Sequence, residues 1–302
     1  MKFLLDSGDP DEYREIASLA KQKGGELWGA TTNPTLIAKK LTAHSGNASG
    51  QGQKIKRDEA FALQKKIVLE ILEIVPGAVS AEVYADANTT AEEMVEQGRT
   101  IATWHERVVV KLPTTIEGLR ARTELRKANV VTNNTLVFSQ EQIFAICLHE
   151  QIIQSEFSLS DPAWPPFISP FVGRLDDIGQ QGIDLIANGM KIKKLLKPTL
   201  WMLEASVRSV QHITEGEELG SELITAPGKV YKEFFQGTTA PDKSASQLSP
   251  IPYWEPSEEL LSINSVDAFM EAITSGDLDI HHELTDKGIF RFAQDWNTLI
   301  VN

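Results

Sequence analysis

Short apolar runs alternate with longer amphipathic segments along most of the 302-residue chain. The runs are almost continuously apolar, which is typical of strands that are buried on both faces of a parallel sheet. Eight segments follow this pattern: 2–8, 27–33, 79–84, 108–113, 130–137, 167–172, 199–207 and 222–227. Because helical patterns separate them, they predict a (β/α)₈ TIM barrel, with a doubly wound open sheet as the alternative.

The segments between the runs carry helix signals. Asp9 suits an N-cap, Pro10 suits the first helical position and Glu12 adds an acid to the first turn. Gly24 marks the end of this helix. The segment Thr114–Glu117, directly after the fourth run, has the spacing of a second capping box. These signals support the alternation of strands and helices.

The whole chain, 1–302, is expected to form one barrel domain with insertions near 42–56 and 237–280. Residues 44–53 are rich in Gly, Ser and Asn and residues 237–258 in Pro, Ser and Thr, so both stretches are expected to be insertions in connecting loops. The second is either a lid over a site or a surface excursion. Apolar residues at helical spacing predict an amphipathic helix near 286–300, which would cover the barrel or a partner subunit of a homo-oligomer.

The net charge of the chain restricts the kinds of partner that it is expected to bind. With 29 basic and 42 acidic residues, the net charge is −13, which disfavours binding to nucleic acid or to an anionic membrane. The first apolar run stops at Asp6, too short for a signal peptide, and no stretch has the length of a membrane-spanning helix. The lone Cys147 excludes an internal disulfide framework. A cytoplasmic location is therefore expected.

Polar residues lie on a single parity near the end of seven of the eight runs. Successive side chains of a strand point to opposite faces, so one parity faces the barrel interior. Active sites of barrel enzymes lie at the C-terminal ends of the strands, where these residues fall. The set comprises Asp6; Thr31 and Asn33; Ser80 and Glu82; Lys111; Asn133 and Thr135; Ser169 and Phe171; and Glu204, Ser206 and Arg208.

Lys111, in the fourth run, is the strongest chemical candidate. The structural alternative is a lysine at a strand end that extends its ammonium to solvent. Asp6 and Glu82, however, are expected to point into the same cavity, so an amine and two acids would occur together. A lysine that attacks a carbonyl must be neutral; burial favours that form, whereas neighbouring carboxylates oppose it.

Arg174 and Arg208 follow the sixth and seventh runs, and Ser206 lies near the second of them. Two guanidinium groups and a hydroxyl suit a dianion clamp, although surface arginines paired with carboxylates would give the same pattern. The sequence has no Gly-rich phosphate-binding motif. Its six histidines, including the pair His281–His282, lack the spacing of zinc ligands, so no metal site is predicted.

These residues resemble the transaldolase family, including its shorter bacterial and archaeal members and the related fructose-6-phosphate aldolases. The matching stretches follow the family's order: LLDSGD, GATTNPTLI, SAEV, VVVKLPTTIEGL, TNNTLVFS, ISPFVGRLDDIG, EASVR and LTDKGIFRF. TTNP, ISPFVGR and LTDKG are the most specific of them. The resemblance covers nearly the whole chain outside the insertions and implies class I aldolase chemistry without a metal or cofactor.

The resemblance also implies four catalytic residues. Lys111 matches the lysine that forms the Schiff base, and Asp6 matches the acid/base that takes the C4 hydroxyl proton when the C3–C4 bond breaks. Glu82 matches the carboxylate that acts through a water in forming and hydrolysing the Schiff base. Thr135 matches the residue that holds this water.

Substrate-binding positions match in the same way. Asn33 and Asn133 match the amides that bind hydroxyls of the dihydroxyacetone unit, and Ser169 matches a second hydroxyl contact there. The phosphate site of the family matches Arg174, Ser206 and Arg208. Asn134 departs from the family pattern, but its parity turns it away from the cavity, so we expect an effect on packing alone.

The resemblance implies a transferase that moves a dihydroxyacetone unit from a ketose phosphate to an aldose phosphate in the pentose phosphate pathway. Transaldolases carry Glu and Phe where the aldolases tend to carry Gln and Tyr, and this chain has Glu82 and Phe171. Two alternatives stay open: cleavage of fructose 6-phosphate without an acceptor, and a barrel that binds sugar phosphates without catalysis. Acceptor dependence of turnover distinguishes the first from the transferase.

Overall fold

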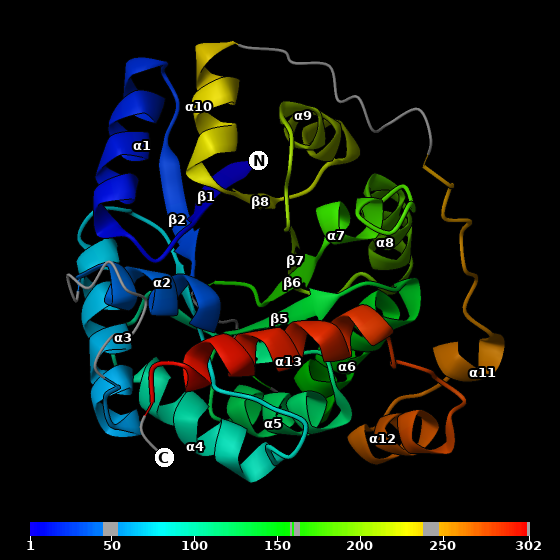
Figure 1. Cartoon of the computed structure of the whole chain (residues 1–302). Coiled ribbons are helices and arrows are strands. Elements are labelled where there is room, and N and C mark those ends of the chain that lie inside the picture. The colour runs from blue at the N-terminus through cyan, green and yellow to red at the C-terminus, as the bar shows by residue number, and fades with distance from the viewer. Residues whose placement is uncertain (45–53, 158, 160–163, 238–247, 301–302) are drawn as a thin grey trace.

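The structure is a computed structural model that describes residues 1–44, 54–157, 159, 164–237 and 248–300 (Figure 1). Its centre is a closed barrel of eight parallel strands, which pair in sequence order and close through β8 and β1. All eight expected strands are present, and closure excludes the open doubly wound sheet. The predicted (β/α)₈ barrel is therefore confirmed.

Each strand lies inside the apolar run that predicted it. The strands are β1 (Lys2–Asp6), β2 (Leu27–Thr31), β3 (Val79–Glu82), β4 (Val108–Pro113), β5 (Thr132–Val137), β6 (Phe167–Pro170), β7 (Trp201–Glu204) and β8 (Leu223–Ala226). In the register of the sheet, Glu82 pairs with Lys111, and Lys111 pairs with Asn133. Three of the predicted site residues are thus fixed side by side by backbone pairing.

Helices follow the strands and form the outer layer (Figure 1). Those described are α1 (Pro10–Gln22), α2 (Pro34–His44), α3 (Arg57–Leu72), α4 (Ala91–Ala102), α5 (Ile116–Lys127), α6 (Gln140–Phe157), α7 (Val172–Asp176), α8 (Ile183–Leu196), α9 (Val210–Leu219), α10 (Gly228–Gln236), α11 (Glu258–Leu261), α12 (Val266–Ser275) and α13 (Glu283–Asn297). Most of them bury one apolar face against the strands, as a barrel requires.

The helix signals were read correctly in one place and wrongly in another. Asp9 caps α1, and its side chain accepts a hydrogen bond from the backbone N–H of Asp11. The expected capping box at Thr114 is wrong, because Thr115 is the N-cap of α5. The Thr114 hydroxyl instead donates to the backbone oxygen of Thr135, at 2.9 Å, and ties the end of β4 to β5.

The barrel interior has an apolar layer below a polar one. The apolar layer includes Leu4, Val109, Phe167, Leu203 and Leu223, which pack together in one cluster. Two residues further along four of these strands stand Asp6, Lys111, Ser169 and Thr225. Residues two apart on a strand face the same side, so the inward-facing positions change from apolar to polar toward the C-terminal ends of these strands. This change separates the packed core from the polar cavity.

A buried ion network lies outside the barrel, between α5 and α6. Glu150 accepts from Arg122, at 2.5 Å, and from Arg126, at 2.8 Å, and all three side chains are almost fully buried. Arg122 also donates to the side chain of Asn134, at 2.9 Å. Asn134 thus faces away from the cavity, as its parity predicted.

Helix α13 crosses the end of the barrel and packs against α2 and β5 (Figure 1). It begins and ends three residues earlier than the helix expected near 286–300. Its apolar residues Ile289, Phe292 and Trp296 are buried, so they cover the barrel of their own chain. Contact of this helix with a second copy of the chain, in a homo-oligomer, stays a prediction. Among the described residues, no helix has the length and apolar character needed to cross a bilayer.

The described part of the second insertion packs against the outside of the barrel. The side chain of Gln140, on α6, donates to the backbone oxygen of Pro252 and accepts from the backbone N–H of Trp254. No residue of the described segment 248–280 lines the cavity beside Lys111, and this segment contains the helices α11 and α12. The remaining expected loop residues, 45–53 and 238–247, lie outside the described residues.

Candidate active site

Lys111 ends in a nearly dry position inside the barrel. Its side chain is 4% exposed, and its Nζ lies 3.1 Å from Oε2 of Glu82, whose side chain is 5% exposed. The same nitrogen donates to the backbone oxygen of Thr32, at 3.3 Å. The alternative of a lysine that extends into bulk water is therefore excluded. An amine held in this way is positioned to meet a ligand that enters the cavity.

Asp6, at the end of β1, shares this cavity with Lys111. Its Oδ1 accepts from the hydroxyl of Thr31, at 2.8 Å, and Thr31 is linked in turn to the hydroxyl of Thr225, at 2.7 Å. Burial raises the pKa of Asp6, and the opposing effects of Lys111 and Thr31 only reduce this rise. Its carboxyl therefore holds a proton more readily than an exposed aspartate does.

Glu82, at the end of β3, is subject to the same opposing effects of burial and of the Lys111 charge. Burial raises its pKa, while the charge of Lys111 and a hydrogen bond from it lower it, and burial dominates. Its backbone oxygen accepts from the side chain of Gln64, at 3.1 Å, which fixes the end of the strand. Two carboxyls with raised pKa values thus lie near one amine, an arrangement that suits repeated proton transfer.

Amide and hydroxyl groups continue the polar layer on the other side of Lys111. The side chain of Asn133 donates to the hydroxyl of Ser80, at 3.1 Å, and accepts from the hydroxyl of Ser169, at 2.7 Å. Asn33 lines the cavity, while its side-chain oxygen accepts from Leu36 at the start of α2. The polar set of β5 and β6 is therefore prearranged by its own hydrogen bonds.

Thr135 is fully buried, and its hydroxyl oxygen finds no hydrogen-bond partner within the described part of the chain. It stands beside Pro113, two residues beyond Lys111, in the register of β4 and β5. A buried hydroxyl without a partner is costly, so such a group commonly holds an ordered water.

The cavity beside Lys111 has a volume of about 290 Å³. Eight of the eleven predicted site residues line it: Asp6, Asn33, Lys111, Ser169, Phe171, Arg174, Ser206 and Arg208. The other three do not line this cavity. Glu82 and Asn133 reach it through Lys111 and Ser169, whereas Thr135 has no such link among the described residues.

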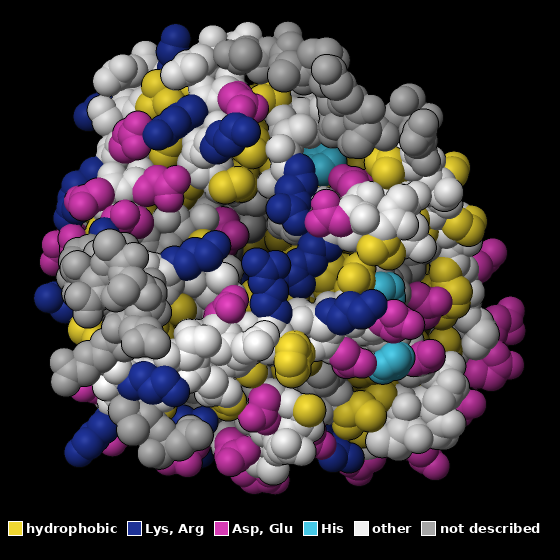
Figure 2. Space-filling model, viewed as in Figure 1, with side chains coloured by type: hydrophobic (Ala, Val, Ile, Leu, Met, Phe, Trp, Pro, Cys, Tyr) yellow, Lys and Arg dark blue, Asp and Glu magenta, His cyan; other side chains and the backbone are white. Residues whose placement is uncertain are grey.

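One end of the cavity is basic and aromatic. The guanidinium carbon of Arg174, on α7, lies 5.3 Å from the ring centre of Phe171 and 5.6 Å from that of Phe292. Arg208 pairs with Asp177 at 2.9 Å. Lys and Arg side chains gather around a hollow at the centre of this face of the molecule (Figure 2). In a chain of net charge −13, this end of the cavity collects positive charge locally, which suits an anion.

The prediction for the seventh strand was wrong at Glu204. Leu203 is the residue of β7 in the interior cluster, so Glu204 points outward. An added Cβ at Gly216, on α9, would lie 1.9 Å from its Oε2. Ser206 has a φ of +59°, which interrupts the strand alternation. For this reason Ser206 lines the cavity even though Glu204 does not.

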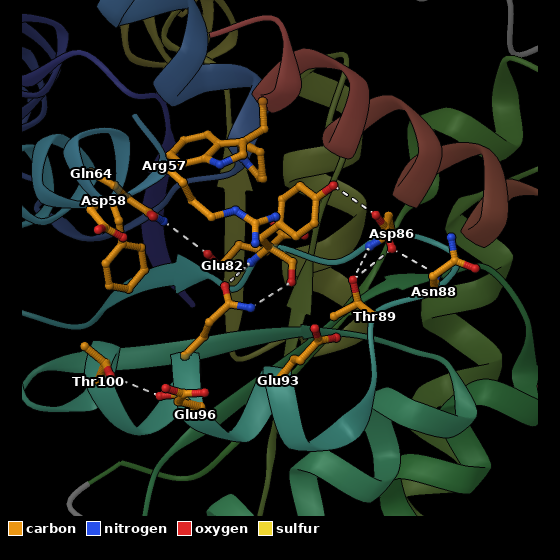
Figure 3. Close-up of a pocket in the computed structure, with 15 residues that line it drawn as sticks. Arg57, Asp58, Gln64, Glu82, Asp86, Asn88, Thr89, Glu93, Glu96 and Thr100 are labelled. Carbon is orange, nitrogen blue, oxygen red and sulfur yellow. Dashed lines mark hydrogen bonds between the residues drawn. The ribbon is translucent and has the colours of Figure 1, made fainter. Parts of the chain in front are cut away.

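A larger cavity, of about 510 Å³, opens between α3 and α4 (Figure 3). It does not include Lys111, and its polar groups largely satisfy one another. Tyr84 donates to Asp86, at 3.0 Å, and Asp86 accepts from the hydroxyl of Thr89, at 2.9 Å. Size alone therefore does not identify the site. The smaller cavity has the convergent amine, acids and arginines that chemistry requires.

Sequence reasoning assigned no role to several residues that line the cavity, among them Lys39, Thr225, Arg291 and Phe292. Thr225 lies near the end of the eighth run, two residues beyond the interior Leu223, so the strand period of two could have identified it. Arg291 and Phe292 stand inside the stretch LTDKGIFRF, but the sequence alone gives no path for α13 across the barrel. Lys39 carries no local signal.

Comparisons with known proteins show which family the chain resembles. Residues 3–301 match the transaldolase/fructose-6-phosphate aldolase family. A probable transaldolase of Alkaliphilus metalliredigens is 30% identical over 300 residues, which cover 99% of this chain and 100% of that protein. A probable transaldolase of Brevibacillus brevis is 37% identical over 77% of this chain and 89% of its own length. One from Thermus thermophilus is 36% identical over 78% and 91%, respectively.

Proposed function

The chain belongs to the transaldolase/fructose-6-phosphate aldolase family, and we propose that it is a transaldolase that forms a Schiff base on Lys111. The donor is a ketose phosphate, sedoheptulose 7-phosphate or fructose 6-phosphate. The acceptor is an aldose phosphate, glyceraldehyde 3-phosphate or erythrose 4-phosphate. The unit transferred is dihydroxyacetone, as in the pentose phosphate pathway.

The first half of the reaction begins with the neutral amine of Lys111, which attacks C2 of the ketose. Water leaves, and the resulting iminium draws electrons from the neighbouring bonds, so that no metal is needed as Lewis acid. Glu82 exchanges the protons of this step, through a water that Thr135 helps to hold. Its position 3.1 Å from the amine and its raised pKa support this role.

Asp6 then removes the proton of the C4 hydroxyl, and the C3–C4 bond breaks. An aldose phosphate leaves, and a three-carbon enamine stays on Lys111, held by Asn33, Asn133 and Ser169. A second aldose phosphate enters with its phosphate on the arginines, the carbon–carbon bond forms, and the steps reverse. The shared cavity of Asp6 and Lys111 supports this sequence.

Simple cleavage differs from transfer only in the fate of the enamine. An aldolase protonates and hydrolyses it, whereas a transaldolase keeps it until an acceptor arrives. Glu82 and Phe171 favour the transferase, because the family's aldolases tend to carry Gln and Tyr at these positions. Release of aldose phosphate that depends on added erythrose 4-phosphate is the expected behaviour; turnover of fructose 6-phosphate alone would favour the aldolase.

One observation carries the proposal: a buried lysine nitrogen lies beside Glu82, in a cavity shared with Asp6 and the arginines. The test is to incubate the protein with fructose 6-phosphate, reduce with borohydride and map the added mass. We expect an adduct on Lys111 and none on the variant Lys111→Met. The matched control is Lys287→Met, which removes an exposed lysine of α13 and should leave the adduct unchanged. Mass on another residue, or no mass, would refute the mechanism.

A further inference from the structure

We propose that Arg291, on α13, is a third guanidinium of the phosphate site and selects substrates that carry a phosphate dianion. This inference rests on the proposed function and extends it to a residue outside the barrel. It follows from the placement of α13, whose Arg291 and Phe292 line the same cavity as Arg174 and Arg208.

One face of α13 is directed at Arg174. Gly288, Arg291 and Phe292 stand at helical positions i, i+3 and i+4, so they share that face. A Cβ added at Gly288 would lie 3.0 Å from Nη1 of Arg174, and the ring of Phe292 is 5.6 Å from the guanidinium carbon. The glycine thus leaves room for Arg174, and Arg291 follows one turn later.

The charges at this end of the cavity are only partly compensated within the described residues. Arg208 pairs with Asp177 at 2.9 Å, whereas Nε of Arg291 lies 3.9 Å from Asp295, which is too far for a hydrogen bond. The pKa of Arg174 is lowered by burial first, and then by the charges of Arg291 and Arg208. Three guanidinium groups that repel one another are stabilised when a dianion binds between them.

A phosphomonoester is the class of ligand that suits the basic end of the cavity, where the three arginines lie. Guanidinium forks match the three terminal oxygens of such a group, and its charge of nearly −2 relieves the repulsion. The side chain of Arg291 is 62% exposed, so each hydrogen bond that it makes is weaker than a buried one. Its loss should therefore weaken phosphate binding by about five- to tenfold, without altering the chemistry at Lys111.

The experiment compares R291Q, R291K and the parent protein at saturating fructose 6-phosphate. The acceptors are glyceraldehyde 3-phosphate and unphosphorylated glyceraldehyde. In R291Q we expect KM for the phosphorylated acceptor to rise about five- to tenfold with little change in kcat, while the unphosphorylated acceptor reacts as in the parent. R291K should recover part of the loss, because lysine keeps the charge and lacks the fork.

The matched control is K287Q, which removes one charge from the same helix at a residue that pairs with Glu283 and lies outside the cavity. It should change neither KM. Unchanged KM for the phosphorylated acceptor in R291Q, or an equal loss with both acceptors, would overturn the inference.

Binding of inorganic phosphate, measured by calorimetry, separates this inference from the proposed function because it needs no turnover. If the parent protein forms no adduct on Lys111 yet binds phosphate more tightly than R291Q does, the proposed function fails and the assignment of Arg291 stands. If the adduct forms and R291Q binds phosphate as the parent does, the mechanism stands and Arg291 has no part in it.

Discussion

Replacing Asp6 by asparagine should separate carbon–carbon cleavage from formation of the Schiff base. The Asp6 carboxylate accepts from the hydroxyl of Thr31, at 2.8 Å, and an asparagine oxygen can accept the same bond. The substitution therefore removes the base with little change in shape. Lys111 keeps its contact with Glu82, so attack on the ketone should continue.

The size of the effect follows from what is lost. A positioned acid or base contributes about 10²- to 10⁴-fold to the rate, so kcat should fall by that factor, or by about 3–5 kcal/mol in the barrier. The same substitution should leave the folded state of D6N as stable as that of the parent, or more stable. Because burial outweighs Lys111 and raises the pKa of Asp6, the ionised carboxylate disfavours the folded state above that raised pKa, and this cost disappears as the pH falls through it.

The assay combines three measurements on D6N at pH 8: transfer kinetics, the borohydride adduct on Lys111 and the thermal midpoint. We expect slow turnover, a retained adduct and a midpoint at or above that of the parent. D11N is the matched control, since the side chain of Asp11 is 80% exposed and forms its closest ion pair with Arg14, whose side chain is half exposed. A variant with more than about a tenth of the parent's kcat would refute Asp6 as the base. A variant that fails to form the adduct would show that Asp6 acts earlier.

Three further predictions concern the pH profile, the phosphate end and the outer layer. Burial raises the pKa of both Asp6 and Glu82, so activity should fall with decreasing pH at values above the ordinary 3.8 and 4.5; a limb at those ordinary values would contradict this. Gly173→Ala would put a Cβ 2.2 Å from the backbone oxygen of Ser206, so urea unfolding should show a loss of about 1–3 kcal/mol and KM for phosphorylated substrates should rise; unchanged KM would argue against the site. Glu150→Gln leaves two buried guanidinium groups without their carboxylate, so stability should fall by about 3–5 kcal/mol with kcat retained, and a loss below about 1 kcal/mol would refute the importance of the network.

The barrel could be predicted because each strand carries its own signal. A parallel strand covered on both faces is nearly continuously apolar, and eight such runs separated by helices admit few arrangements. The same period of two fixed the polar layer, since Lys111 and Glu82 stand on interior parity and pair across β3 and β4. Local pattern and register thus determine most of the amine's surroundings.

The features that the sequence did not predict depend on backbone geometry or on distant packing. Ser206 adopts a φ of +59°, in the left-handed region, which breaks the alternation of side chains along β7. Glu204 and Ser206 therefore face different sides, although the strand period of two places them on the same side. The N-cap of α5 shifted by one residue because the hydroxyl of Thr114 bonds to β5 instead of to its own helix. Neither the backbone angle of Ser206 nor the hydrogen bond of Thr114 can be predicted from residue spacing alone.

The two ends of the cavity are also held in different ways, and this has a consequence for specificity. Lys111 and Glu82 belong to paired strands, so moving them requires breaking the sheet. Arg174 stands on the short helix α7, Arg208 in the segment between β7 and α9, and Arg291 on α13, all outside the sheet. Repositioning these three side chains therefore does not require breaking the sheet. We therefore expect changes in acceptor preference to arise from substitutions at this basic end, while the chemistry at the amine stays the same.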